Sequence, residues 1–333
     1  MIRPLAILMA LVSIFATSIG GSPVAADDSF PNKPITIINP LPVGSAPDDV
    51  VRLVGEQLTQ IWGQRVVIDN RPAGGGTVAA QAVASASPDG YTLLLGASAL
   101  FTIFPVQKNK LTIDINRDLV PIGLMGGGAM YLAVSPKLGV NSLPEFIALA
   151  RAHPNSVVIG TNAAGTLPNF AALALAKKAD IPVIVAPYGS GGTLEAIRDI
   201  MGGRVQATVE ALSPLRGPVK SGDLKLIAVM SSARNPLLPN VPTVSETLPG
   251  FTAVGFLSLA APARTPEPIV RRLNEGLRRA LETPSVKRRL EEFDMVRPIL
   301  TPTETRAYIN AEEKDWWPMV KQLDQIQATR SKR

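Results

Sequence analysis

Alternation of apolar segments with helical segments is the feature that most constrains how this chain can fold. From Lys33 onward, apolar runs that read as strands are separated by runs with helical periodicity. The strand runs are PITIINP, QRVVIDN and YTLLLGAS, and the helical runs cover residues 48–62 and 76–87. Nearly continuous apolar strands that alternate with helices are typical of parallel sheets covered on both faces. The sequence therefore predicts an α/β fold.

The same alternation starts again after GGGAMYLAVSP, and it continues through the strand runs SVVIGTN, IPVIVAPY, RVQATVE and LKLIAVMS. FTAVGFLSLAAPA then leads out of this second unit as a strand. The remainder is helical, with one helix opening at Thr265–Pro266 and another at Thr301 that ends near Trp316–Trp317. Because helices without a sheet of their own must pack on an existing one, we expect the chain to return to its first unit.

This organisation predicts two α/β lobes joined by two crossings, near residues 124–132 and 252–260. Two crossings make a hinge, and a hinge between two lobes makes a cleft. We assign residues 27–126 to the first part of lobe 1, residues 127–254 to lobe 2, and residues 255–333 to the C-terminal part of lobe 1.

The N-terminal segment is predicted to be a secretory signal peptide. Arg3 precedes an apolar core from Leu5 to about Ile19, and small residues precede Asp27, so cleavage is expected after Ala26. The core is shorter than the roughly 20 residues that a spanning helix needs. The chain has no cysteine, which excludes disulfides, thiolate chemistry and a lipid anchor on a cleavage-site cysteine. We therefore expect a soluble periplasmic protein.

The net charge of +6 first suggests a nucleic-acid partner, but the basic residues are scattered. The densest stretch, RRLNEGLRRALETPSVKRRLEEF, interleaves them with glutamates and is typical of a solvated helix face. No nucleic-acid partner is expected.

Catalytic chemistry has little support in the sequence. The single histidine, His153, stands at a predicted helix end, where a capping role is favoured over catalysis. One histidine and no cysteine exclude a Cys–His pair and a His-rich zinc site. No glycine-rich loop ends in Gly-Lys-Ser/Thr, the pattern of a nucleotide phosphate loop. We expect no cofactor and no metal.

Loops rich in glycine and hydroxyl residues follow three of the predicted strands. The first carries Gly44, Ser45 and Ala46, with Asp48 in the first helical turn. The second carries Gly165 and Thr166, and the third carries Ser190. A small-residue loop before a helix offers backbone N–H groups to an anion, although each loop alone is also compatible with a plain turn. Loops from both lobes would clamp a carboxylate in the cleft.

Several motifs along the whole mature chain resemble those of the periplasmic substrate-binding proteins of tripartite tricarboxylate transporters, also called Bug receptors. The resemblance begins at FPNKPITIINPLPVGSAPDDVVR and ends at EKDWWPMV. Between them lie DNRPAGGG, PDGYTLLLG, APY, GPVKSGDLKLIAV and LPNVPTVSETLPGF.

The resemblance implies a two-lobed fold of the periplasmic-binding-protein type (type II) with two hinge crossings. It implies capture of a small carboxylate by backbone amides and delivery to a membrane permease by a monomeric receptor. An orphan binding protein that serves a sensor, and an exported α/β enzyme, are the alternatives. The positions matching the family's site are Gly44, Ser45, Ala46, Asp48, Gly165, Thr166 and Asn169, with Ser98 and Thr102 as further side-chain contacts.

The chain departs from the family pattern at places that bear on the ligand. Ser45 stands for a usual glycine, and Asn169 stands for a usual histidine. The segment after Tyr188 lacks the usual lysine or arginine. Val209–Glu210 and Phe104–Pro105 replace a usual phenylalanine–aspartate and asparagine–proline. Losing a cation and a histidine predicts a ligand with fewer charges or a more apolar one.

Overall fold

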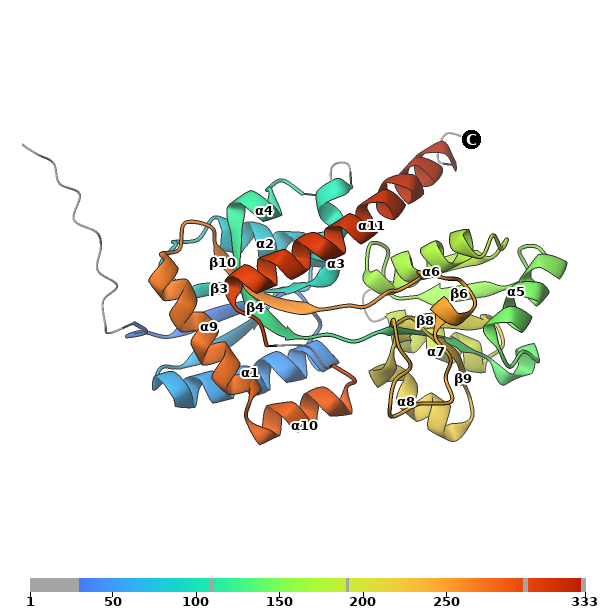
Figure 1. The fold of residues 1–333 in the computed structure, drawn as a ribbon, viewed down its shortest axis with the longest axis horizontal. Helices are drawn as coiled ribbons and strands as arrows, with labels where there is room; N and C mark the ends of the chain where they lie inside the picture. The colour runs from blue at the N-terminus through green and yellow to red at the C-terminus, as the bar shows by residue number, and fades with distance from the viewer. Residues whose placement is uncertain (1–29, 108–110, 190–191, 296–298, 331–333) are drawn as a thin grey trace, which may run out of the picture.

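The structure, a computed structural model, describes residues 30–107, 111–189, 192–295 and 299–330. The predicted signal peptide lies outside these residues. Within them the strands form two five-stranded sheets. The first sheet has the order β2-β1-β3-β10-β4, and the second has the order β7-β6-β8-β5-β9. The α/β fold of two lobes predicted from the alternation is confirmed (Figure 1).

The first sheet consists of β1 (Ile35–Asn39), β2 (Val66–Asn70), β3 (Thr92–Ala97), β4 (Leu119–Gly126) and β10 (Leu257–Pro262). One of its faces is covered by α1 (Ala46–Trp62), α9 (Glu267–Leu281) and α10 (Pro284–Glu292). The opposite face is covered by α2 (Thr77–Ala84), α3 (Ser98–Thr102) and α11 (Pro302–Arg330). The short helices η1 (Gly74–Gly76), η2 (Phe104–Val106) and α4 (Ile115–Asp118) lie in its connections.

The second sheet consists of β5 (Met130–Val134), β6 (Val158–Thr161), β7 (Ile184–Pro187), β8 (Ala207–Ala211) and β9 (Lys225–Val229). Apolar side chains of α5 (Leu143–Ala152) and α6 (Leu167–Lys178) pack on one face. Those of α7 (Gly192–Met201) and α8 (Leu212–Ser221) pack on the other. Two further short helices are η3 (Pro136–Leu138) and η4 (Val244–Glu246).

Both sheets are mixed, whereas the alternation of strands and helices had indicated parallel sheets. Strand β1 pairs in parallel with β2 and β3, whereas β10 runs antiparallel to both β3 and β4. In the second sheet β6 is parallel to β7 and β8, and β5 is antiparallel to β8 and β9. The reversed strand in each sheet is the one that follows a crossing, because the chain enters each sheet from the opposite lobe.

Two crossing segments connect the lobes and pair with each other. The Gly255 N–H donates to the Gly128 carbonyl over 2.9 Å, and the Met130 N–H donates to the Ala253 carbonyl over 3.0 Å. Figure 1 shows them as a green and an orange segment running between the sheets. The two predicted crossings are confirmed, and they are hydrogen-bonded to one another where they pass.

A side-chain cluster also ties the C-terminal part of the chain to the second sheet. Asp294 follows α10 and accepts hydrogen bonds from the Tyr131 hydroxyl over 2.8 Å and from the Asn235 amide over 2.9 Å. Tyr131 lies on β5, and the Asn235 amide also donates to its hydroxyl over 2.8 Å. The lobes therefore meet through side chains as well as through the crossings.

Two elements differ from the sequence-based expectation. Strand β4 was missed, because Pro121 interrupts its pattern; it forms an edge of the sheet, where a missing N–H is tolerated. The last helix does not end near Trp316–Trp317 but continues through Pro318 to Arg330. Trp316, Val320 and Leu323 are buried on one face of it, and their packing carries the helix past the proline.

Candidate functional site

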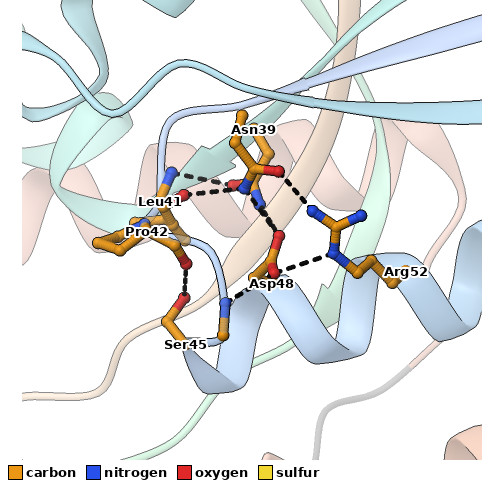
Figure 2. Close-up of polar contacts among 8 residues, drawn as sticks. Asn39, Leu41, Pro42, Ser45, Asp48 and Arg52 are labelled. Atoms are coloured by element: carbon orange, nitrogen blue, oxygen red, sulfur yellow. Dashed lines mark hydrogen bonds and ion pairs between the residues drawn. The ribbon is translucent and has the colours of Figure 1, made fainter.

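The first loop joins β1 to α1 and leaves the start of that helix uncapped. Gly44 has a φ of 79°, in the left-handed region that favours glycine. Ser45 holds the N-cap position, but its hydroxyl donates to the Pro42 carbonyl over 2.7 Å and caps nothing (Figure 2). The amides of Ala46 and Asp48 lie in the first turn, where no intrahelical acceptor precedes them, and Pro47 between them has no N–H. These are the groups that bind anions at helix N-termini.

Asp48 is a buried carboxylate that organises this loop. One of its oxygens accepts from the side-chain amides of Asn39 (2.9 Å) and Asn70 (2.7 Å). The other accepts from the Gly44 N–H (2.9 Å) and from Arg52 Nε (3.0 Å). Figure 2 shows the side chains of Asn39 and Arg52 converging on it. Burial raises the pKa of Asp48, but the hydrogen bonds from Arg52, Asn70 and Gly44 outweigh burial and hold that pKa below its usual value.

The partners of Asp48 come from the ends of neighbouring strands. Asn39 and Asn70 are the last residues of β1 and β2 and face each other in the parallel register. Asn70 also accepts from Arg52 Nη2 over 2.5 Å and donates to the Leu41 carbonyl over 3.1 Å. Asp48 thus has its acceptor capacity used within the protein, and its role in the structure is to hold the loop. Direct contact of Asp48 with a ligand stays a prediction.

The second loop joins β6 to α6 and repeats this design in the other lobe. Gly165 has a φ of 86°. Thr166 is the N-cap, and its hydroxyl donates to the Ala163 carbonyl over 2.7 Å instead of capping the helix. Asn169 is buried and donates to the Thr161 hydroxyl over 3.1 Å. Gly165, Thr166 and Asn169 thus repeat the spacing of Gly44, Ser45 and Asp48, and α6 too begins with uncapped amides.

Short helix α3 meets the second loop at a crossing segment. Ser98 N–H donates to the Phe256 carbonyl over 2.8 Å. A β-carbon built on Gly255 would lie 3.0 Å from Leu167 Cδ2 and 3.6 Å from Ser98 Oγ. The start of α6 and the start of α3 therefore flank the same glycine. Thr102 donates its hydroxyl to the Ser98 carbonyl over 2.9 Å. Within the described ranges the Ser98 hydroxyl has no protein partner.

Phe104 was not among the predicted site residues, yet it contacts glycine loops of both lobes. Phe104 is 4% exposed. A β-carbon built on Gly75 would lie 2.9 Å from Phe104 Cζ, and one built on Gly165 would lie 3.3 Å from Cε1. The sequence signal was the aromatic residue at the place of a usual asparagine. Asn39, Asn70 and Arg52 were also missed, although polar residues that end apolar strands are a usable signal.

Beside the third predicted loop, a hydroxyl group at the start of α7 is hydrogen-bonded to a buried carboxylate of the protein. Ser190 lies outside the described residues. Thr193, in the first turn of α7, donates its hydroxyl to Glu210 at the end of β8 over 2.5 Å, and the Ala211 N–H donates to the other oxygen over 2.9 Å. Burial raises the pKa of Glu210, and these hydrogen bonds offset only part of that effect. No charged partner of Glu210 occurs among the groups that the structure describes.

Glu210→Gln is expected to stabilise the protein at alkaline pH. Because the folded state binds the proton of Glu210 more tightly than the unfolded chain does, ionising Glu210 costs stability as the pH rises above about 4.5. Without the charge, glutamine can accept from the Ala211 N–H with its carbonyl oxygen and donate its amide N–H to the Thr193 hydroxyl. We expect the variant to unfold about 2 °C higher than the parent at pH 8 and at the same temperature at pH 4.

Glu246→Gln is the control, because it is expected to lower the unfolding temperature at pH 8, where Glu210→Gln raises it. A hydrogen bond from Arg234 is the main cause that lowers the pKa of Glu246 to about 2. Its stabilisation is therefore present above about pH 4.5 and is lost as the pH falls toward 2. Thermal unfolding of both variants between pH 4 and 8 should give shifts of opposite sign at pH 8. A Glu210→Gln shift that does not depend on pH would contradict the assignment.

The described part of the chain offers no cluster suited to a metal and no helix suited to a membrane. No three histidine, cysteine, aspartate or glutamate side chains come together there as ligands. None of its helices combines the length and the apolar character needed to cross a bilayer. His153, as predicted, holds the C-cap position of α5.

Comparisons with known proteins point to one receptor family. A family model described as "Tripartite tricarboxylate transporter family receptor" matches residues 50–325. Protein BugT of Bordetella pertussis is 31% identical over 318 residues, which cover 95% of this chain and 97% of BugT.

Two solved structures of Rhodopseudomonas palustris proteins align over most of the chain. Rpa4515 with adipate has a TM-score of 0.80 at 27% identity, covering 88% of this chain and 97% of that one. MatC (Rpa3494) with bound malate has a TM-score of 0.78 at 28% identity, covering 87% of this chain and 100% of that one.

Proposed function

The chain belongs to the tripartite tricarboxylate transporter receptor family, and from this premise we propose that it captures a small organic carboxylate between its lobes and delivers it to a membrane permease. The family is one of periplasmic binding proteins. We infer that the protein binds its ligand without changing it chemically and works in the periplasm. The adipate and malate carried by its structural neighbours support the ligand class.

The observation that carries this proposal is the pair of matched loops. Helices α1 and α6 come from different lobes, and neither is capped by a side chain. Each begins after a glycine in the left-handed region and a hydroxyl residue that is turned back onto the loop. The positive end of each helix dipole and its free amides favour an anion. A carboxylate held by both would link the lobes.

Ligand capture would work through the crossings. An anion bound by loops of both lobes stabilises the arrangement in which they are close, so the ligand shifts the population of conformers toward closure. The paired segments at Gly128 and Gly255 are the connection about which such a motion would occur.

The test introduces a carboxylate at the N-cap of α1. In Ser45→Asp, the new side chain would cap the free amides and occupy the place of the ligand's anion. Residues 27–333, with and without the substitution, would be titrated with dicarboxylates, tricarboxylates, aromatic acids and amino acids while thermal unfolding is followed. A ligand at 100 times its dissociation constant stabilises the parent by about 2.7 kcal/mol. We expect the variant to bind at least about tenfold more weakly without unfolding earlier when ligand-free.

Thr283→Asp is the matched control. Thr283 is the N-cap of α10, and its hydroxyl also donates three residues back, to the Ala280 carbonyl over 2.7 Å. Helix α10 follows another helix instead of a strand, so this variant should bind like the parent. Equal binding by the parent and Ser45→Asp, or no stabilisation of the parent by any carboxylate, would overturn the proposal.

A further inference from the structure

Phe104 lies between the glycine loops of the two lobes. Its ring is so close to Gly75 that an added β-carbon there would be 2.9 Å away. On the other side, a β-carbon on Gly165 would be 3.3 Å away. Contacts this short are tighter than ordinary side-chain packing, so both loops need glycine to approach the ring.

These contacts place the ring next to the loop before α6 and, through Gly75 and Gly76, near the start of the loop before α1. Gly165 directly precedes the uncapped start of α6. Gly76, the neighbour of Gly75, approaches Pro40 at the start of the first loop, where an added β-carbon would lie 3.4 Å from the Pro40 β-carbon. An anion held by α1 and α6 would therefore have an aromatic ring beside it. A phenylalanine ring offers no hydrogen bond to the rest of the ligand.

Among the residues that the structure describes, Arg52 and Arg289 are the cations placed near the first loop, and both are already engaged. Arg52 reaches the first loop, but it donates to Asp48 and Asn70. Arg289 of α10 lies 3.4 Å from Asp49 in the first turn of α1, and both side chains are about half exposed. A second carboxylate on the ligand would lose water beside an apolar ring, and the described cations Arg52 and Arg289 are already paired with carboxylates of the protein.

We propose that Phe104 is a specificity-determining residue that selects monocarboxylates with an apolar body over dicarboxylates. The inference rests on the proposed function, because it takes the carboxylate to be held by the amides of α1 and α6. The buried ring makes the surroundings of the bound carboxylate apolar, which disfavours a second charge there.

Matched acids that differ only in the second carboxylate test this. Hexanoate would be compared with adipate, and benzoate with terephthalate, by calorimetric titration of the parent, Phe104→Asn and Phe104→Leu. We expect the parent to prefer the monocarboxylate of the pair that it binds by at least about tenfold. Phe104→Asn should reduce the ratio of the monocarboxylate affinity to the dicarboxylate affinity by about tenfold. Phe104→Leu, which stays apolar, should leave this ratio unchanged. Phe104→Gln replaces the asparagine variant if thermal unfolding shows that the latter does not fold.

The outcomes separate the two proposals. Equal or tighter binding of the dicarboxylate by the parent overturns the role of Phe104 and leaves the carboxylate receptor standing. An unchanged preference for the monocarboxylate in folded Phe104→Asn, or in Phe104→Gln where that variant replaces it, also overturns the role of Phe104 and leaves the carboxylate receptor standing. If neither these acids nor the broader panel above bind the parent, the proposed function itself fails.

Discussion

Asp48→Ala is expected to lower the free energy of unfolding by about 4 kcal/mol and to weaken carboxylate binding at least tenfold. The carboxylate is 2% exposed and accepts four hydrogen bonds from Asn39, Asn70, Gly44 and Arg52. Alanine would leave buried amides without acceptors, and each such group costs about 1–3 kcal/mol. It would also release the Gly44 N–H, so the loop before α1 would lose its shape.

The neighbouring residue gives the control. Asp49 carries the same charge in the same helical turn, but its side chain is 52% exposed and its contact with Arg289 spans 3.4 Å. Exposed ion pairs contribute about 0–1 kcal/mol, so Asp49→Ala should unfold close to the parent. Chemical denaturation measures both free energies. Equal losses in the two variants would mean that Asp48 is not the organising group of the loop.

Gly127→Ala is expected to destabilise the protein by about 3 kcal/mol, because it forces the two crossing segments apart. A β-carbon built on Gly127 would lie 2.0 Å from the Gly255 carbonyl oxygen and 2.8 Å from Phe256 Cα. Both are backbone atoms, which cannot rotate away as a side chain can. We expect an unfolding midpoint about 8 °C lower, and weaker ligand binding because the proposed closure would occur about these segments.

Gly217→Ala is its control. Gly217 lies in α8, and nothing comes within 4 Å of its added β-carbon. Alanine is a better helix former than glycine by about 1 kcal/mol, so this variant should be as stable as the parent or slightly more stable. Scanning calorimetry compares the two. If Gly127→Ala has the same unfolding midpoint as the parent, the crossing segments can move apart without loss of stability.

Much of the fold was predictable because the apolar runs have the length and spacing of buried strands. The reversed strands β5 and β10 were harder, since a strand's direction in its sheet depends on where the chain re-enters that sheet. Helix α11 is longer than predicted because the contacts of Val320 and Leu323 with the core outweigh the helix-breaking effect of Pro318. Such contacts form only after the whole fold has assembled.

The site was predictable at its loops and not in the contacts between them. Glycine, a hydroxyl residue and proline before a helix are local signals, and Gly44 and Gly165 do adopt the conformation that favours glycine. By contrast, Asn39 and Asn70 meet because β1 and β2 pair in one register. Phe104 reaches Gly165 only through the approach of the lobes. The spacing of residues along the sequence indicates neither the pairing of these strands nor the approach of the lobes.

The position of β10 has a consequence for the order in which the chain can fold. Strands β1, β3 and β4 are complete within the first 126 residues, but β10, which lies between β3 and β4, ends at Pro262. During synthesis, the first sheet therefore stays incomplete between β3 and β4 until β10 has been made. The second sheet is built wholly from residues 130–229, and it can close before its partner. The second sheet can thus be complete before the first, although the first begins earlier in the chain, and the lobe that contains β10 is finished last.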